Sequence, residues 1–158
     1  MTAQTLRSGL GLAVAAWLVA GTLAAREELP RPQFKYAAGT ESLSQGCEGN
    51  LELNSQGMTF KCPGGSVSAP YSSISLMQYR SDVSNKVRKM KVKWTVRPDF
   101  VAPLLGGKRN RFFTVVFRAG GTTRVLVLRV PPGAMRPYLA EIDLKAEKRV
   151  EVESYEEY

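Results

Sequence analysis

The chain has 158 residues, a formal net charge of +8, no histidine and two cysteines, Cys47 and Cys62. This length excludes a large enzyme scaffold such as a full α/β barrel. Setting aside residues 1–25 as a leader leaves about 130 residues, which is enough for one small domain. The lack of histidine removes the usual chemistry of serine hydrolases and histidine-ligated zinc enzymes.

The first 25 residues have the pattern of a signal peptide. Arg7 precedes 18 uncharged residues at positions 8–25, and small residues near position 24 suit a signal peptidase. We expect cleavage after Ala24 or Ala25 and export to the periplasm or the medium. The competing interpretation is an uncleaved membrane anchor through residues 8–25, because this stretch would nearly cross a bilayer core of about 30 Å. Its many glycines and alanines favour cleavage.

A linker and a first β-hairpin follow the leader. Residues 26–33 are charged and contain two prolines, which prevent a helix and predict a linker. Residues 34–36 are expected to form a short edge strand. Alternating apolar positions in residues 50–53 and 58–61 predict a hairpin with a turn near residues 54–57.

The two cysteines bracket this hairpin. In an exported protein we expect Cys47 and Cys62 to form a structural disulfide, which would close a loop of about 15 residues and contribute about 3 kcal/mol. A turn centred at Ser55 and Gln56 places Cys62 opposite Gly49, so a bulge or a larger turn is required to align Cys47. The alternative is a reactive thiol pair, which the wide spacing of the two cysteines disfavours.

Period-two patterns predict further strands. Apolar residues alternate in residues 74–78. In residues 89–97 every odd position is polar and every even position is apolar, which predicts a half-buried strand. Residues 111–118 and 122–130 are rich in Val, Phe and Thr, and the glycines between them suit a tight hairpin.

The pattern changes to helical spacing near the C-terminus. Met135, Tyr138, Leu139 and Ile142 lie on one side of a helix predicted within residues 133–148. The acidic tail, residues 151–158, is able to extend as an edge strand before it frays. The chain is therefore predicted to be mainly β, with about seven strands in an antiparallel sandwich or partly open barrel and one C-terminal helix.

The sequence resembles pleckstrin-homology-like (PH-like) domains, including their bacterial and GRAM-type branches. The residues that carry the resemblance are Gly-Asn-Leu-Glu-Leu at 49–53, Gly-Met-Thr-Phe at 57–60 and Ala-Pro-Tyr-Ser-Ser-Ile at 69–74. The similarity covers residues 34–150 and implies a non-catalytic binding scaffold, whose relatives bind phosphoinositides, peptides or other proteins. The turn at residues 54–57 has no basic residue, so recognition of a lipid headgroup does not carry over from the resemblance.

The positive charge is concentrated in residues 86–111, which hold nine basic residues and one acidic residue, Asp99. A surface of this kind attracts acidic lipids, acidic polysaccharides or acidic proteins, and nucleic acid is a less favoured partner outside the cytosol. The competing interpretation is a solvated sheet face whose lysines prevent edge aggregation. The candidate anion-binding residues are Lys89, Lys91, Lys93, Arg97, Lys108, Arg109 and Arg111.

No motif predicts catalysis, a metal or a cofactor. The serines have no histidine to activate them, and no glycine pair continues into a phosphate-binding loop. We therefore expect an exported, non-catalytic binding module. The alternatives are a membrane-anchored accessory protein and a small exported hydrolase that works without histidine.

Overall fold

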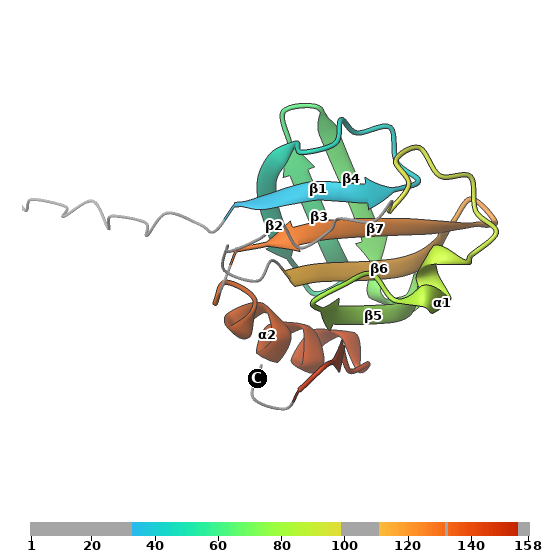
Figure 1. Ribbon diagram of the computed structural model, residues 1–158. Helices are drawn as coiled ribbons and strands as arrows, with labels where there is room; N and C mark the ends of the chain where they lie inside the picture. Colours follow the sequence, from blue (N-terminus) through green and yellow to red (C-terminus); the bar gives the residue numbers. More distant parts are fainter. Residues whose placement is uncertain (1–32, 99–110, 132, 155–158) are drawn as a thin grey trace, which may run out of the picture.

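The computed structural model describes residues 33–98, 111–131 and 133–154. The predicted leader and nearly all of the linker lie outside these residues. The elements, in chain order, are β1 (Phe34–Gly39), β2 (Glu48–Leu53), β3 (Gly57–Cys62), β4 (Gly65–Pro70), the 3-10 turn η1 (Tyr71–Ser73), β5 (Ile74–Arg80), α1 (Asn85–Arg88), β6 (Arg111–Ala119), β7 (Thr122–Val130), α2 (Arg136–Ala146) and β8 (Glu151–Val152) (Figure 1).

The protein is mainly β, as the sequence predicts. Eight strands follow the order β4-β3-β2-β1-β7-β6-β5-β8, and the sheet is not closed, because β4 and β8 form its two ends. Neighbouring strands are antiparallel except β8, which pairs in parallel with β5 through Gln78 and Glu151. The start of the acidic tail thus adds an edge strand and makes the sheet mixed.

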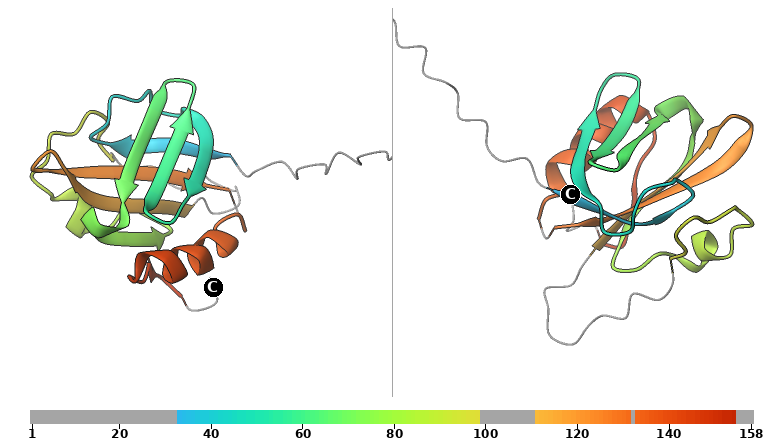
Figure 2. Two further views of the ribbon diagram at one scale, coloured as in Figure 1. Left: turned by 180° about the vertical axis from the view of Figure 1, so that it is seen from behind. Right: turned by 90° about the horizontal axis from the view of Figure 1, so that it is seen from above.

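The main core lies between two halves of this sheet. β1 pairs with β2 only through Phe34 and Lys35, so β1 joins β2–β4 to the half formed by β5–β7. The two halves face each other across buried apolar side chains (Figure 2). The largest fully buried members include Tyr36, Phe60, Phe113 and Phe117.

The C-terminal helix α2 lies at one end of this core, below the strands in Figure 1. Leu139 and Ile142 are buried, and Met135 is buried just before the helix. Tyr138 packs edge-to-face against Phe34, with ring centroids 5.1 Å apart. The predicted apolar side of the helix is therefore confirmed.

The outer face of β5, β6 and β7 is also apolar and forms a second core. Phe112 and Val116 of β6 and Val125 and Val127 of β7 are buried on this face. They are covered by residues 81–98, which we call the covering segment. In the view from above in Figure 2, this segment lies on the side of β6 and β7 that faces away from β3 and β4.

The strand predicted for residues 89–97 is wrong. Only Val96 makes a bridge to a strand, with Gly39. Inside the segment, Val92 N donates to Met90 O at 3.0 Å and Trp94 N donates to Val92 O at 3.1 Å, which is the pattern of consecutive three-residue turns. Each such turn advances the chain by two residues. The alternation of apolar and polar positions is therefore kept without strand pairing.

The sequence did not predict strand β4. The number of strands still agrees with the prediction, because β4 is gained where the strand at residues 89–97 is lost. Val67 and Ala69 of β4 are buried while Ser66 and Ser68 are exposed, so it has the alternation of a half-buried strand. Most residues of β4 are small, and Gly, Pro and, to a lesser degree, Ala are depleted in strands. β4 pairs with β3 from Gly57 opposite Pro70 to Cys62 opposite Gly65. This pairing stabilises the strand despite the low strand propensity of its residues.

Candidate anion-binding surface

The covering segment is fixed at both ends, which determines where its basic residues lie. At its start, Val87 of α1 is fully buried in the second core. At its end, Gly39 N donates to Val96 O at 2.9 Å, Val96 N donates to Gly39 O at 3.0 Å, and Thr95 Oγ1 donates to Thr40 O at 3.0 Å. Residues 89–93 are therefore held between two anchored points on one side of the sheet.

A polar network centred on the buried Gln78 positions α1 at the start of the segment. Ser84 Oγ donates to Gln78 Oε1 at 2.7 Å, and Gln78 Nε2 donates to Glu151 Oε2 at 2.6 Å. Gln78 is 5% exposed, so both of its polar atoms require these partners. The network joins the covering segment, β5 and β8.

The predicted row of basic side chains is exposed. Lys89, Lys91, Lys93 and Arg97 all face solvent, while Met90, Val92, Trp94 and Val96 pack against the second core. Among the described residues, no carboxylate forms an ion pair with any of the four basic side chains. The sequence thus predicted correctly which of these side chains face solvent and which pack against the core. The element that carries them was predicted wrongly, because it is not a strand.

Lys91 lines a hollow of about 660 Å³, which we call the basic groove. Arg118 from the end of β6 and Lys148 from the residues after α2 line the same groove, and no carboxylate of the described residues does. Lys148 Nζ donates to Ile74 O at 2.5 Å, which fixes its ammonium group at the start of β5. The remaining lining residues are Ser72, Ser73, Ile74, Ser75, Met90, Val92, Val116 and Thr123.

A second hollow of about 590 Å³ adjoins the basic groove and shares Lys91, Val92 and Thr123 with it. It is rich in hydroxyl groups and adds two basic residues, Lys93 and Arg124. Its single carboxylate, Glu41, accepts two hydrogen bonds from Arg124 Nη1, at 3.0 and 3.2 Å. The two hollows thus lie side by side at Lys91, and the lining of each carries a positive charge.

The sequence did not single out Arg118, Arg124 or Lys148. Lys91 and Arg118 are far apart in the chain, and the fold of the second core brings them to one groove. The only sequence signal was the position of Arg118 and Arg124 on either side of the Gly120-Gly121 hairpin. That position predicts exposure at a hairpin end but not which segment lies beside it.

The remaining predicted anion-binding residues lie elsewhere. Lys108 and Arg109 fall outside the described residues. Arg111 begins β6, roughly 23 Å along the strand from Arg118 at about 3.3 Å per residue. Arg111 Nη1 lies 3.3 Å from Glu153 Oε2, and its guanidinium lies 5.7 Å from the Tyr79 ring centroid. The structure therefore brings Arg111 to the C-terminal tail and not to the basic groove.

Glu153 ties this tail to the sheet. The hydrogen bond from the Ser81 backbone N–H, at 3.0 Å, is the largest cause of its lowered pKa, and the Ser81 hydroxyl and the charges of Arg80 and Arg111 lower it further. In the main core, burial raises the pKa of Tyr36 to about 12. Neither group lines the basic groove, so these pKa shifts reflect interactions that hold the fold together.

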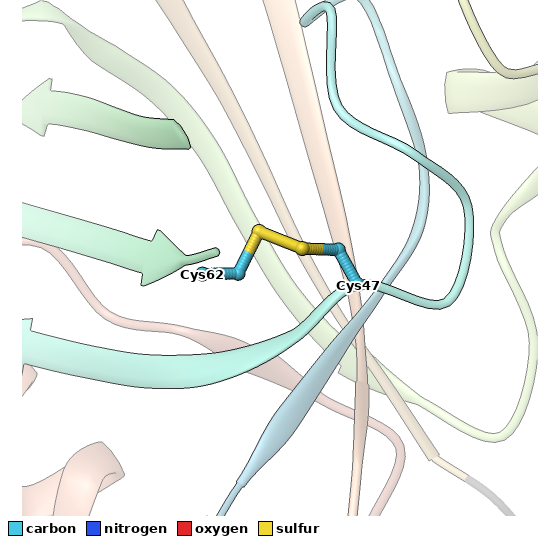
Figure 3. Close-up of a disulfide and its surroundings, with 2 residues drawn as sticks. All are labelled: Cys47 and Cys62. Atoms are coloured by element: carbon cyan, nitrogen blue, oxygen red, sulfur yellow. A yellow bond between two sulfur atoms is a disulfide. The ribbon is translucent and has the colours of Figure 1, made fainter. Parts of the chain in front are cut away.

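The predicted disulfide is present and joins the end of β3 to the residue before β2 (Figure 3). The Cα atoms of Cys47 and Cys62 are 6.1 Å apart. Leu51 pairs with Phe60 without a register shift, which places Gly49 opposite Cys62 as predicted. The expected bulge or larger turn is not used, because Cys47 lies in the loop just before β2 and the loop supplies the alignment.

Other site types have little support in the described part of the chain. There, no three His, Cys, Asp or Glu side chains gather closely enough to hold a metal ion. Within the same residues, no helix is both long enough and apolar enough to span a membrane. Comparison of the chain with protein-family models, curated proteins and solved structures finds no match.

Proposed function

We propose that this chain is an exported, non-catalytic binding module of PH-like architecture that engages an anionic partner through its basic surface. The observation that carries the proposal is the exposed row of Lys89, Lys91, Lys93 and Arg97, none of which has a carboxylate partner among the described residues. Exposed charges of one sign on an anchored segment repel one another unless anions are near. An anionic partner would relieve this repulsion.

Export is supported by the signal-peptide pattern of residues 1–25 and by the Cys47–Cys62 disulfide, since disulfides persist in oxidising compartments. N-terminal sequencing of the protein recovered from its native compartment tests this part of the proposal. A new N-terminus at Ala25 or Arg26 is expected. An intact Met1 on membrane-bound protein would instead support the anchored accessory protein.

Binding is tested with the triple variant K89Q/K91Q/K93Q. Wild-type protein is expected to bind anionic vesicles or an acidic polysaccharide at low salt and to lose affinity steeply as salt rises, because each exposed contact is worth about 1 kcal/mol and is screened. The triple variant should bind more weakly and keep its thermal stability, since its side chains point to solvent.

A matched control removes three lysines that already have carboxylate partners. Lys35, Lys61 and Lys145 pair with Glu48, Glu52 and Glu141, respectively. The variant K35Q/K61Q/K145Q loses the same formal charge and should retain binding. Equal loss in both variants would assign the effect to net charge alone, and wild-type protein that binds no anionic probe would overturn the proposed function.

A further inference from the structure

We propose that the basic groove is the anchoring site for a linear acidic polysaccharide, whose carboxylate or sulfate groups contact Lys91, Arg118 and Lys148 and whose chain continues into the adjoining hollow. This inference rests on the proposed function and specifies its partner and its site. The first support is the convergence of three cations from three separate segments in one hollow, which no carboxylate in the described part of the chain lines.

The lining of the groove has the chemistry that such a polymer requires. Arg118 presents a planar guanidinium, which binds carboxylate and sulfate through paired hydrogen bonds. Three serine hydroxyls suit sugar hydroxyl groups as well. Ser73 Oγ and Ser75 Oγ donate to the backbone oxygens of Pro70 and Val116 and can still accept, while the exposed Ser72 hydroxyl can both donate and accept. Arg118 makes no ion pair in the described part of the chain, so its charge is available.

The shape of the two adjoining hollows favours an extended chain over a small anion. The two hollows of about 660 and 590 Å³ meet at Lys91 and Thr123, and Lys93 lies in the second one. A single phosphate or sulfate would occupy part of one hollow. A polymer with repeated negative charges would contact Lys91 and Arg118 in the first hollow and Lys93 in the second.

The distribution of apolar residues disfavours a lipid bilayer as the partner. Peripheral proteins commonly bind membranes by combining basic residues with apolar side chains that enter the interface. In the described part of the chain the one exposed large apolar side chain is Leu144, which is 85% exposed and lies on α2. It lines neither hollow.

The experiment compares two double variants that lose equal charge. K91Q/R118Q removes two cations of the groove, and K86Q/R149Q removes two exposed cations that line neither hollow and do not belong to the row of Lys89, Lys91, Lys93 and Arg97. Affinity for polygalacturonate and for heparin is measured by titration calorimetry at low salt and at about 0.15 M salt. Vesicles containing phosphatidylglycerol and inorganic phosphate serve as the other two probes.

We expect K91Q/R118Q to lower polysaccharide affinity about tenfold or more, and K86Q/R149Q to lower it less than about threefold. Either polysaccharide should raise the unfolding temperature of wild type but not that of K91Q/R118Q. Equal losses in the two variants, or binding to vesicles or phosphate alone, would overturn this inference and leave the proposed function standing. No binding of wild type to any probe would overturn both.

Discussion

Gly39 and Val96 are joined by two backbone hydrogen bonds, from Gly39 N to Val96 O at 2.9 Å and from Val96 N to Gly39 O at 3.0 Å. This pair attaches the end of the covering segment to the end of β1. A Cβ atom at position 39 would lie 2.4 Å from Val125 O and 2.8 Å from Tyr36 Oη. The close approach requires glycine, and the position of the exposed lysines depends on it.

Gly39→Ala is therefore expected to lower the free energy of unfolding by about 1–3 kcal/mol, because backbone atoms of β7 must shift. Urea unfolding of the purified domain measures the loss. Gly64→Ala is the matched control, since a Cβ there would make ordinary contact with Cys47 Sγ at 3.6 Å, and it should change stability by less than about 0.5 kcal/mol. Equal effects of the two substitutions would contradict the close approach at Gly39.

Removal of the disulfide tests how much the covalent link between the end of β3 and the residue before β2 stabilises the fold. The variant C47A/C62A should be less stable than wild type by about 2–4 kcal/mol, because the unfolded chain regains the freedom of the loop that Cys47 and Cys62 close. Denaturant unfolding measures the difference, and mass spectrometry of a non-reduced digest should show the two peptides linked. Two thiols that alkylate in exported material would reopen the reactive-pair interpretation.

Ser84→Ala tests the polar network that positions α1. The substitution leaves the buried Gln78 Oε1 without its donor and removes the side-chain cap of α1, so a loss of about 1–2 kcal/mol is expected. Thermal unfolding measures it. Ser66→Ala, at an exposed position of β4, is the control and should be nearly neutral. A neutral Ser84→Ala would show that water satisfies Gln78.

Low pH is expected to weaken the contacts by which Glu153 holds the C-terminal tail to Ser81 and Arg111. The pKa of Glu153 in the fold lies below its ordinary value of 4.5, chiefly because the Ser81 backbone N–H donates to the carboxylate. Its contribution is thus present above about pH 4.5 and is lost as the pH falls through the folded-state pKa.

Glu153→Gln should lower stability by about 0.5–1 kcal/mol at neutral pH, the range of exposed ion pairs, and the difference from wild type should shrink below pH 4.5. Urea unfolding of both proteins at a series of pH values gives this difference directly. A difference that stays constant down to pH 3 would show that the charge of Glu153 contributes nothing.

The sequence by itself determined the elements that local periodicity encodes. The β6–β7 hairpin, the apolar side of α2 and the register that places Gly49 opposite Cys62 all agree with the prediction. The exposure of Lys89, Lys91 and Lys93 also agrees. Local patterns are sufficient for these features. Alternation fixes which side of an extended chain meets apolar surface, helical spacing does the same for α2, and glycines between two β-rich segments indicate the β6–β7 hairpin.

The tertiary structure alone decided what the covering segment packs against. Alternation at residues 89–97 does not distinguish a strand from an extended segment, since both place every second residue on one side. The apolar runs of β6 and β7, broken in β6 only by Thr114, were the available signal: a strand that is apolar on both faces needs a layer on each. Lys91, Arg118 and Lys148 meet because that layer lies over Val116, and contacts between residues so distant in the chain leave no trace in local sequence.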